Sequence, residues 1–145
     1  MDKALNYVAL ARKAGRVELG EEPVGAAARA QHARLVIVAS DASDHSWRRA
    51  KSFVAGTKQQ CIRLPYTKDE LGQAVGRQSL AMAAFTDPAM ALAFAKALEK
   101  VDPQVLEELE VRTRRVQQRQ QEEKAHQRNK RLGKPKRKPA AVKKD

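Results

Sequence analysis

The feature that most constrains the fold of this chain is a run of five apolar residues, Leu35-Val36-Ile37-Val38-Ala39, with polar residues on either side. The run is too short for a helix, and three of its five members are β-branched, which favours a strand. Since apolar and polar residues do not alternate within it, both of its faces must be covered. A strand covered on both faces predicts helices on each side of a sheet, and therefore a three-layer α/β/α sandwich.

Helices and strands are expected to alternate around this central strand. Ser43 is placed to cap a helix, Thr67 and Glu70 form a capping-box pattern, and Pro23 and Pro88 suit the first turns of two further helices. Further strands are expected over residues 17–19, 61–64 and 80–85. The pattern therefore predicts a four-stranded mixed sheet with helices between the strands.

Charge indicates what kind of partner the chain binds. The formal net charge is +12 and the isoelectric point is about 10.2. A strongly basic chain of this size favours an anionic partner, and nucleic acid is a better candidate than a membrane surface. The sequence contains no apolar run of membrane-spanning length and no secretory leader, so we expect a cytoplasmic protein without a membrane partner.

Metal and cofactor sites are not expected. Cys61 is the only cysteine, which rules out an internal disulfide and a thiolate zinc site, and core packing is its simplest role. His32, His45 and His126 lie far apart without the spacing of metal ligands. Ser43 and Asp44 lie beside His45, but neighbours in sequence do not make a catalytic triad, and no nucleophile elbow accompanies them. We therefore expect no catalytic residues and no cofactor.

The chain divides into parts with different composition. Residues 1–98 carry a net charge of +5 and almost all of the strong apolar blocks, which predicts one folded domain. Residues 99–131 are rich in Glu, Gln, Lys and Arg, and Asp102-Pro103 begins an expected charged helix without a sustained heptad seam. Residues 132–145 are expected to form a disordered basic tail that binds phosphates with little sequence preference. A monomer is expected, and truncation after Lys100 should leave a folded domain.

Three short motifs occur in a fixed order along the predicted domain. They are Gly20-Glu21-Glu22, then the central strand followed by Ser40-Asp41-Ala42, then Glu70-Leu71-Gly72-Gln73-Ala74-Val75-Gly76. In this order and spacing they resemble the kink-turn-binding ribosomal proteins, the family of the L-seven-Ae and L-thirty-e proteins, and most closely its bacterial YlxQ-like branch. The resemblance covers roughly residues 4–98.

The resemblance implies an RNA-binding surface built from three loops. They are a glycine-led helix start, the loop after the second strand and the loop before the last strand. In this chain the implied RNA-binding residues are Gly20, Glu21, Glu22, Ser40, Asp41, Ala42, Gly76, Arg77, Gln78, Ser79 and Leu80. The helix start offers backbone N–H groups to phosphate, Arg77 offers a cation, and Ala42 and Leu80 offer apolar contact to splayed bases.

The chain departs from this family at one motif. Typical members begin the helix with Gly-x-Asn-Glu-x-x-Lys, and this chain has Gly20, Glu22, Pro23 and Ala26 at the four named positions. Glu22 can still accept hydrogen bonds from a guanine edge, but Pro23 cannot, and Ala26 removes a cation. The leading hypothesis is a non-catalytic protein that contacts structured ribosomal or other non-coding RNA, or the ribosome itself.

Two alternatives remain open. One is a protein-binding adaptor of the translation apparatus that has lost specific kink-turn recognition, and the departures at Pro23 and Ala26 motivate it. The other is the RNA-binding module of an assembly that modifies ribosomal RNA, because a similar fold precedes the catalytic domain of some RNA methyltransferases. No cofactor-binding domain follows residue 98 in this sequence.

Overall fold

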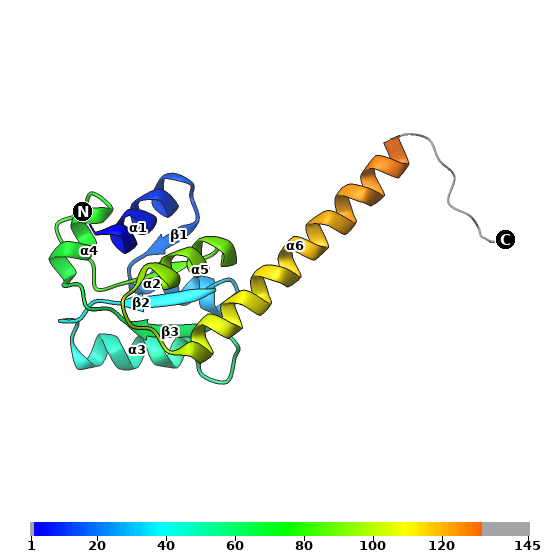
Figure 1. Cartoon of the computed structure of the whole chain (residues 1–145). Helices are drawn as coiled ribbons and strands as arrows, with labels where there is room; N and C mark the ends of the chain where they lie inside the picture. Colours follow the sequence, from blue (N-terminus) through cyan, green and yellow to red (C-terminus); the bar gives the residue numbers. More distant parts are fainter. Residues whose placement is uncertain (1, 132–145) are drawn as a thin grey trace. The chain divides into compact units, whose positions relative to one another are not determined.

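The structure is a computed structural model that describes residues 2–131. The basic tail expected at 132–145 lies outside the described residues. Helices and strands alternate through the first hundred residues, as predicted (Figure 1). The elements are α1 (Lys3–Lys13), β1 (Val17–Leu19), α2 (Glu21–Arg29), β2 (Leu35–Val38), α3 (Asp44–Val54), β3 (Gln60–Arg63), α4 (Lys68–Ala74), β4 (Met82–Phe85), α5 (Pro88–Ala97) and α6 (Pro103–Arg131).

Side-chain caps fix where the helices begin. Ser43 accepts from the Ser46 N–H at the start of α3, and Thr67 and Glu70 form the predicted capping box at the start of α4. Asp87 caps α5, where Pro88 occupies the first helical position. Leu80, expected to begin the last strand, lies before it, because its N–H donates to Lys68 in α4 and not to a neighbouring strand.

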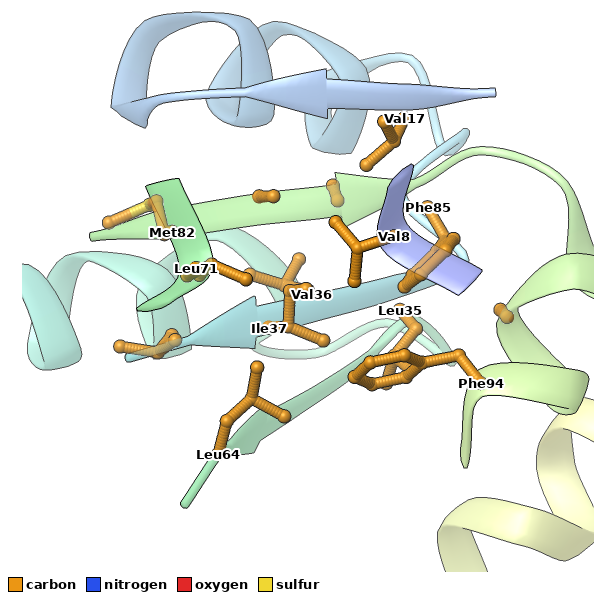
Figure 2. Close-up of a cluster of buried hydrophobic side chains, with 14 of the residues drawn as sticks. Val8, Val17, Leu35, Val36, Ile37, Leu64, Leu71, Met82, Phe85 and Phe94 are labelled. Carbon is orange, nitrogen blue, oxygen red and sulfur yellow. The ribbon is translucent and has the colours of Figure 1, made fainter. Parts of the chain in front are cut away.

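The sheet is mixed and four-stranded, in the order β1-β4-β2-β3. β4 pairs antiparallel with both β1 and β2, whereas β3 runs parallel to β2. Consequently β1, β2 and β3 all end at the edge of the sheet where β4 begins. Figure 2 shows β1 and β2 pointing toward this edge, with Met82 of β4 beside it.

The core surrounds the two central strands. Every residue of β2 and β4 is buried, which confirms that the central strand is covered on both faces. α1 packs against α4 and α5, and α2 packs against α3, so the helices form separate groups around the sheet. On the α1 side, Val8, Leu71 and Phe94 meet the side chains of the sheet (Figure 2). The three-layer sandwich predicted from the sequence is therefore present.

The compact unit extends beyond residue 98. Val105 and Leu109, in the first turns of α6, are 7% and 2% exposed and belong to the hydrophobic core, and the unit reaches Thr113. From Gln117 to Arg131 every residue of α6 is exposed, in a second unit that starts at Arg114. Within residues 2–131, no helix is both long and apolar enough to cross a membrane.

Candidate nucleic-acid interface

The sheet topology brings the three sequence motifs to one edge. Gly20 follows the end of β1, residues 40–42 follow the end of β2, and residues 76–80 precede β4. Backbone hydrogen bonds connect them to the start of β4, because Gly20 N–H donates to the carbonyl of Met82, the first residue of β4, and Ala39 N–H donates to that of Ala81 just before it. The predicted site residues therefore lie on one edge although they are far apart in the sequence.

Gly20 gives the start of α2 an open approach. Its φ of 95° lies in a region that residues with a Cβ rarely adopt, so the turn from β1 into α2 favours glycine. No side chain caps this helix. Pro23 has no N–H, which leaves the N–H groups of Glu21 and Glu22 as the donors of the first turn. This end of α2 is suited to an anion by its donors and by the positive end of the helix dipole.

The loop after β2 is fastened to the start of α4. The Asp41 carboxylate accepts a 2.8 Å hydrogen bond from the Lys68 N–H, and the Lys68 carbonyl accepts one of 3.0 Å from the Leu80 N–H. Ser40 N–H donates to the Tyr66 carbonyl at 2.8 Å. The Lys68 backbone thus joins two of the three motifs, and the Asp41 carboxylate has a structural partner.

The loop before β4 lies directly against α4 at Gly72. Arg77 N–H donates to the Gly72 carbonyl at 2.8 Å. A Cβ built on Gly72 would lie 2.7 Å from the Ser79 Cα and 2.9 Å from the Arg77 carbonyl oxygen. Gly72 therefore permits a backbone contact that a larger residue would prevent. Gly76, at a φ of 75°, makes the turn out of α4.

Arg77 and Gly20 are neighbours at this edge. A Cβ built on Gly20 would lie 3.9 Å from Nη1 of Arg77. Arg77, Gln78 and Ser79 are all exposed. The guanidinium of Arg77 therefore lies beside the start of α2, where it adds a positive charge and five donors to the backbone N–H groups.

A second cation approaches the start of α2 from α3. Nε of Arg49 is 2.9 Å from the Glu21 carboxylate, and the Arg49 guanidinium lies 5.2 Å from the centre of the Phe53 ring. Arg49 lines a surface hollow together with Ala26 and Arg29. Glu21 and Glu22 line the same hollow, so the two arginines around Ala26 are balanced by two carboxylates.

Arg63 holds the loop after β2 from its other side. Its Nη2 donates to the Ala42 carbonyl at 2.9 Å, and its guanidinium lies 5.3 Å from the centre of the Trp47 ring. Lys51 lies over the same ring at 5.1 Å. Trp47 therefore lies between cations from two elements, Lys51 of α3 and Arg63 of β3, and Arg63 fixes the loop after β2.

The structure differs from the expected roles of two site residues. Ala42 is 5% exposed and Leu80 is 4% exposed, and both belong to the hydrophobic core. Their side chains therefore stabilise the loops and do not face solvent, where a base would bind. The sequence placed these residues in short apolar loop segments but could not show which way each side chain points.

Two titratable groups of the domain, the Cys61 thiol and the Tyr66 phenol, have raised pKa values and are neutral at pH 7. Burial, partly opposed by the charge of Lys51, raises the pKa of the Cys61 thiol to about 12. The pKa of the Tyr66 phenol is raised to about 12, mainly by burial. The carboxylates of Asp2, Glu70 and Glu99 raise it further. Residues 2–131 contain no group of three or more His, Cys, Asp or Glu side chains that could hold a metal ion.

Sequence reasoning missed Lys68, Arg49 and Arg63 as members of this edge. Lys68 follows β3, and a parallel β2–β3 pair would have indicated that both strands end at the same edge. Nothing in the sequence around Arg49 indicates that α2 and α3 pack together. The packing of α2 against α3 is a tertiary contact, which no local sequence pattern predicts.

Comparison with known proteins identifies the family. The model of the Ribosomal protein L7Ae/L30e/S12e/Gadd45 family matches residues 2–92. The RNA-binding protein YlxQ of Enterococcus faecium is 33% identical over 75 residues, which cover 52% of this chain and 72% of that protein.

One solved structure shares the fold, a Bacillus halodurans protein of unknown function, with a TM-score of 0.64, 23% identity, and coverage of 69% of this chain and all of that one. A 15.5kD RNA binding protein of Giardia lamblia aligns with a TM-score of 0.49 at 20% identity, over 64% of this chain and 79% of that one. By the family match over residues 2–92, this chain belongs to the Ribosomal protein L7Ae/L30e/S12e/Gadd45 family.

Proposed function

We propose that this protein is a non-catalytic, cytoplasmic RNA-binding protein that contacts structured RNA with the edge where β1, β2 and β3 end. The observation that carries the proposal is the position of Arg77 beside the uncapped start of α2, 3.9 Å from a Cβ built on Gly20. Backbone donors, a helix dipole and a guanidinium converge there on one exposed surface. RNA phosphates and the edges of unstacked bases are the groups that such a surface binds.

The known relatives agree with this chemistry. The E. faecium relative is described as an RNA-binding protein, and the matched family is one of ribosomal proteins. Three carboxylates near the interface already accept hydrogen bonds from protein donors: Glu21 from Arg49, Asp41 from Lys68, and Glu70 from Thr67. Their pairing reduces the repulsion that an RNA strand would otherwise meet at this edge.

The finer proposal is that the preferred RNA contains a kink-turn or a similar bend, as part of ribosomal or other non-coding RNA. A bent RNA can contact all three loops on this edge at the same time. A straight duplex would contact fewer of them. Arg77 would contact a phosphate or stack on a splayed base, while the first N–H groups of α2 bind the neighbouring phosphate. Ala42 and Leu80 support these loops from the core.

The test compares binding of a kink-turn RNA with binding of a straight duplex of equal length. Arg77→Ala should weaken kink-turn binding by about 1–3 kcal/mol, the cost of one good base or stacking contact. Arg12→Ala is the matched control, because Arg12 is an exposed arginine at the end of α1, on the opposite edge of the sheet. It should leave the preference for the kink-turn unchanged.

A double variant makes the test stricter. Gly20→Glu combined with Arg77→Ala places a carboxylate where phosphate approaches and removes the cation beside it, so the preference for the kink-turn should disappear. If the double variant binds the kink-turn RNA as tightly as the parent does, this edge does not bind RNA. A role as a protein-binding adaptor of the translation apparatus would then explain the surface better.

A further inference from the structure

The exposed part of α6 carries a continuous stripe without acidic residues. Between Arg114 and Arg131, six positions spaced alternately three and four residues apart lie along one side of the helix, because an α-helix turns by about 100° per residue. These positions hold four cations and two amides: Arg114, Gln117, Gln121, Lys124, Arg128 and Arg131. All six are exposed. We name this set the α6 stripe.

The acidic residues of this segment lie on the other side. Residues 114–131 contain seven Lys and Arg and two Glu, a net charge of +5. Glu122 and Glu123 are both rotated by about 130° from the centre of the α6 stripe, calculated at 100° per residue. The opposite face therefore carries both glutamates in addition to Arg115, Arg119 and Lys130, so its net charge is only +1. Lys124, Arg128 and Arg131 line one surface hollow with Gln121, which shows that they share a side.

Two kinds of partner fit the α6 stripe poorly. Val116 and Ala125 are the only apolar residues of 114–131, so the segment offers no apolar seam to a second copy or to an amphipathic helix. Residues 99–131 contain no Phe, Tyr or Trp, and His126 is rotated by about 170° from the centre of the α6 stripe, so the stripe lacks the stacking contacts that bind single-stranded nucleic acid. What remains is a line of cations and amides on an exposed helix.

We propose that the α6 stripe binds the sugar-phosphate backbone of base-paired RNA, without reading its sequence. The stripe is about 25 Å long at a rise of 1.5 Å per residue. In duplex DNA each strand carries one phosphate about every 3.4 Å of helix axis, so a surface of this length on a nucleic-acid duplex faces several phosphates. Arg and Lys pair with the phosphates, and Gln117 and Gln121 supply donors and acceptors for phosphate or 2′-hydroxyl groups. The α6 stripe shares no residue with the Arg77 edge, so its binding can be tested independently.

The experiment measures binding of the full chain to a straight RNA duplex of about 20 base pairs, longer than the ~16 that a double-stranded RNA-binding domain spans. The stripe variant is Lys124→Gln with Arg128→Gln and Arg131→Gln. The matched control is Arg115→Gln with Arg119→Gln and Lys130→Gln, which removes the same charge from the opposite face. Glutamine keeps the helix propensity of lysine and arginine, and circular dichroism checks that the helix persists in both.

The readout is the slope of log affinity against log salt. Each lost phosphate contact should reduce the slope by about 0.9, the value for duplex DNA, so the stripe variant should lose roughly two to three units and bind at least about tenfold more weakly. The control variant should lose less than about one unit. Arg128→Lys with Arg131→Lys should bind like the parent, because a backbone contact requires the charge and not the guanidinium.

Three results would overturn the proposal. The stripe and control variants could weaken binding equally, which would mean that net charge alone attracts the duplex. The stripe variant could bind as the parent does. Polyglutamate could bind the full chain more tightly than the duplex does and be weakened as strongly by the stripe variant. That result would indicate an acidic protein surface as the partner. Arg77→Ala separates the two sites, because it should weaken kink-turn binding and leave the straight duplex unaffected.

Discussion

The carboxylate of Asp41 accepts a 2.8 Å hydrogen bond from the backbone N–H of Lys68, 27 positions later in the sequence. Because the Lys68 carbonyl accepts from Leu80, this single residue connects the loop after β2 with the loop before β4. The interface is therefore held together by backbone contacts of α4, and its geometry depends on residues that need not touch RNA.

Removing the Asp41 carboxylate tests this positioning role. Asp41→Ala should lower the free energy of unfolding by about 0.5–2 kcal/mol, the usual range for losing such a cap, and should weaken kink-turn RNA binding as the loop loosens. Asp69→Ala is the control, since Asp69 is an exposed carboxylate in the first turn of α4. If the Asp41 carboxylate acted only by its negative charge, both variants would bind RNA more tightly than the parent. That result would argue against a positioning role for Asp41.

The close contact at Gly72 makes a second prediction. Gly72→Ala should destabilise the protein by about 1–3 kcal/mol, because the new Cβ would lie 2.7 Å from the Ser79 backbone, which cannot move without shifting the loop before β4. Gly25→Ala is the comparison, since its Cβ would meet side-chain ends and no backbone: the far end of the Phe53 ring at 3.0 Å and Nη1 of Arg29 at 3.5 Å. Thermal unfolding measures both, and equal stabilities would show that the loop accommodates the methyl group.

The end of the folded domain can be located by truncation. The apolar pattern predicted a boundary near residue 98, yet Val105 and Leu109 are buried in the core. Truncation after Gln117 should leave the unfolding transition unchanged. Truncation after Lys100 should keep a cooperative transition at a lower temperature, because each buried Val or Leu contributes about 1.5–3 kcal/mol. Identical stability of the two truncated chains would show that the start of α6 does not stabilise the domain.

The Cys61 thiol should be unreactive in the folded protein. Its pKa is raised from 9.0 to about 12 by burial, so almost no thiolate forms at pH 8, and a disulfide reagent should react far faster after denaturation. The thiol ionises first in the unfolded chain, so its contribution to stability is fully present below pH 9 and declines as the pH rises toward 12. Rapid labelling of the native protein at pH 8 would contradict this.

The sequence predicted most of the secondary structure because its signals are local. The run at 35–39, the capping box at Thr67 and the proline at position 88 each specify an element within a few residues. The family resemblance supplied which loops belong to the site. Side-chain orientation was not predictable in this way, since Leu80 and Ala42 occur in loop segments yet face the core.

Contacts between elements could not be predicted from local sequence patterns either. The pair of Arg49 and Glu21 joins α3 to α2, and the packing of Val105 brings α6 into the domain. Both depend on how distant segments meet, and a charged helix with a few spaced valines and leucines is equally consistent with a solvated extension. The departures at Pro23 and Ala26 were visible in the sequence, but the nearby cations from α3 and from residue 77 were not.

The most direct test of the account is to map the RNA contact residue by residue. Amide chemical shifts of the full chain can be followed by NMR while a kink-turn RNA is added. The account predicts the largest changes at residues 20–22, 40–42, 68 and 76–79, which belong to one edge of the sheet, with small changes at the opposite edge around Arg12. Changes confined to residues 114–131, with the edge unaffected, would contradict the claim that these three loops form the RNA-binding surface.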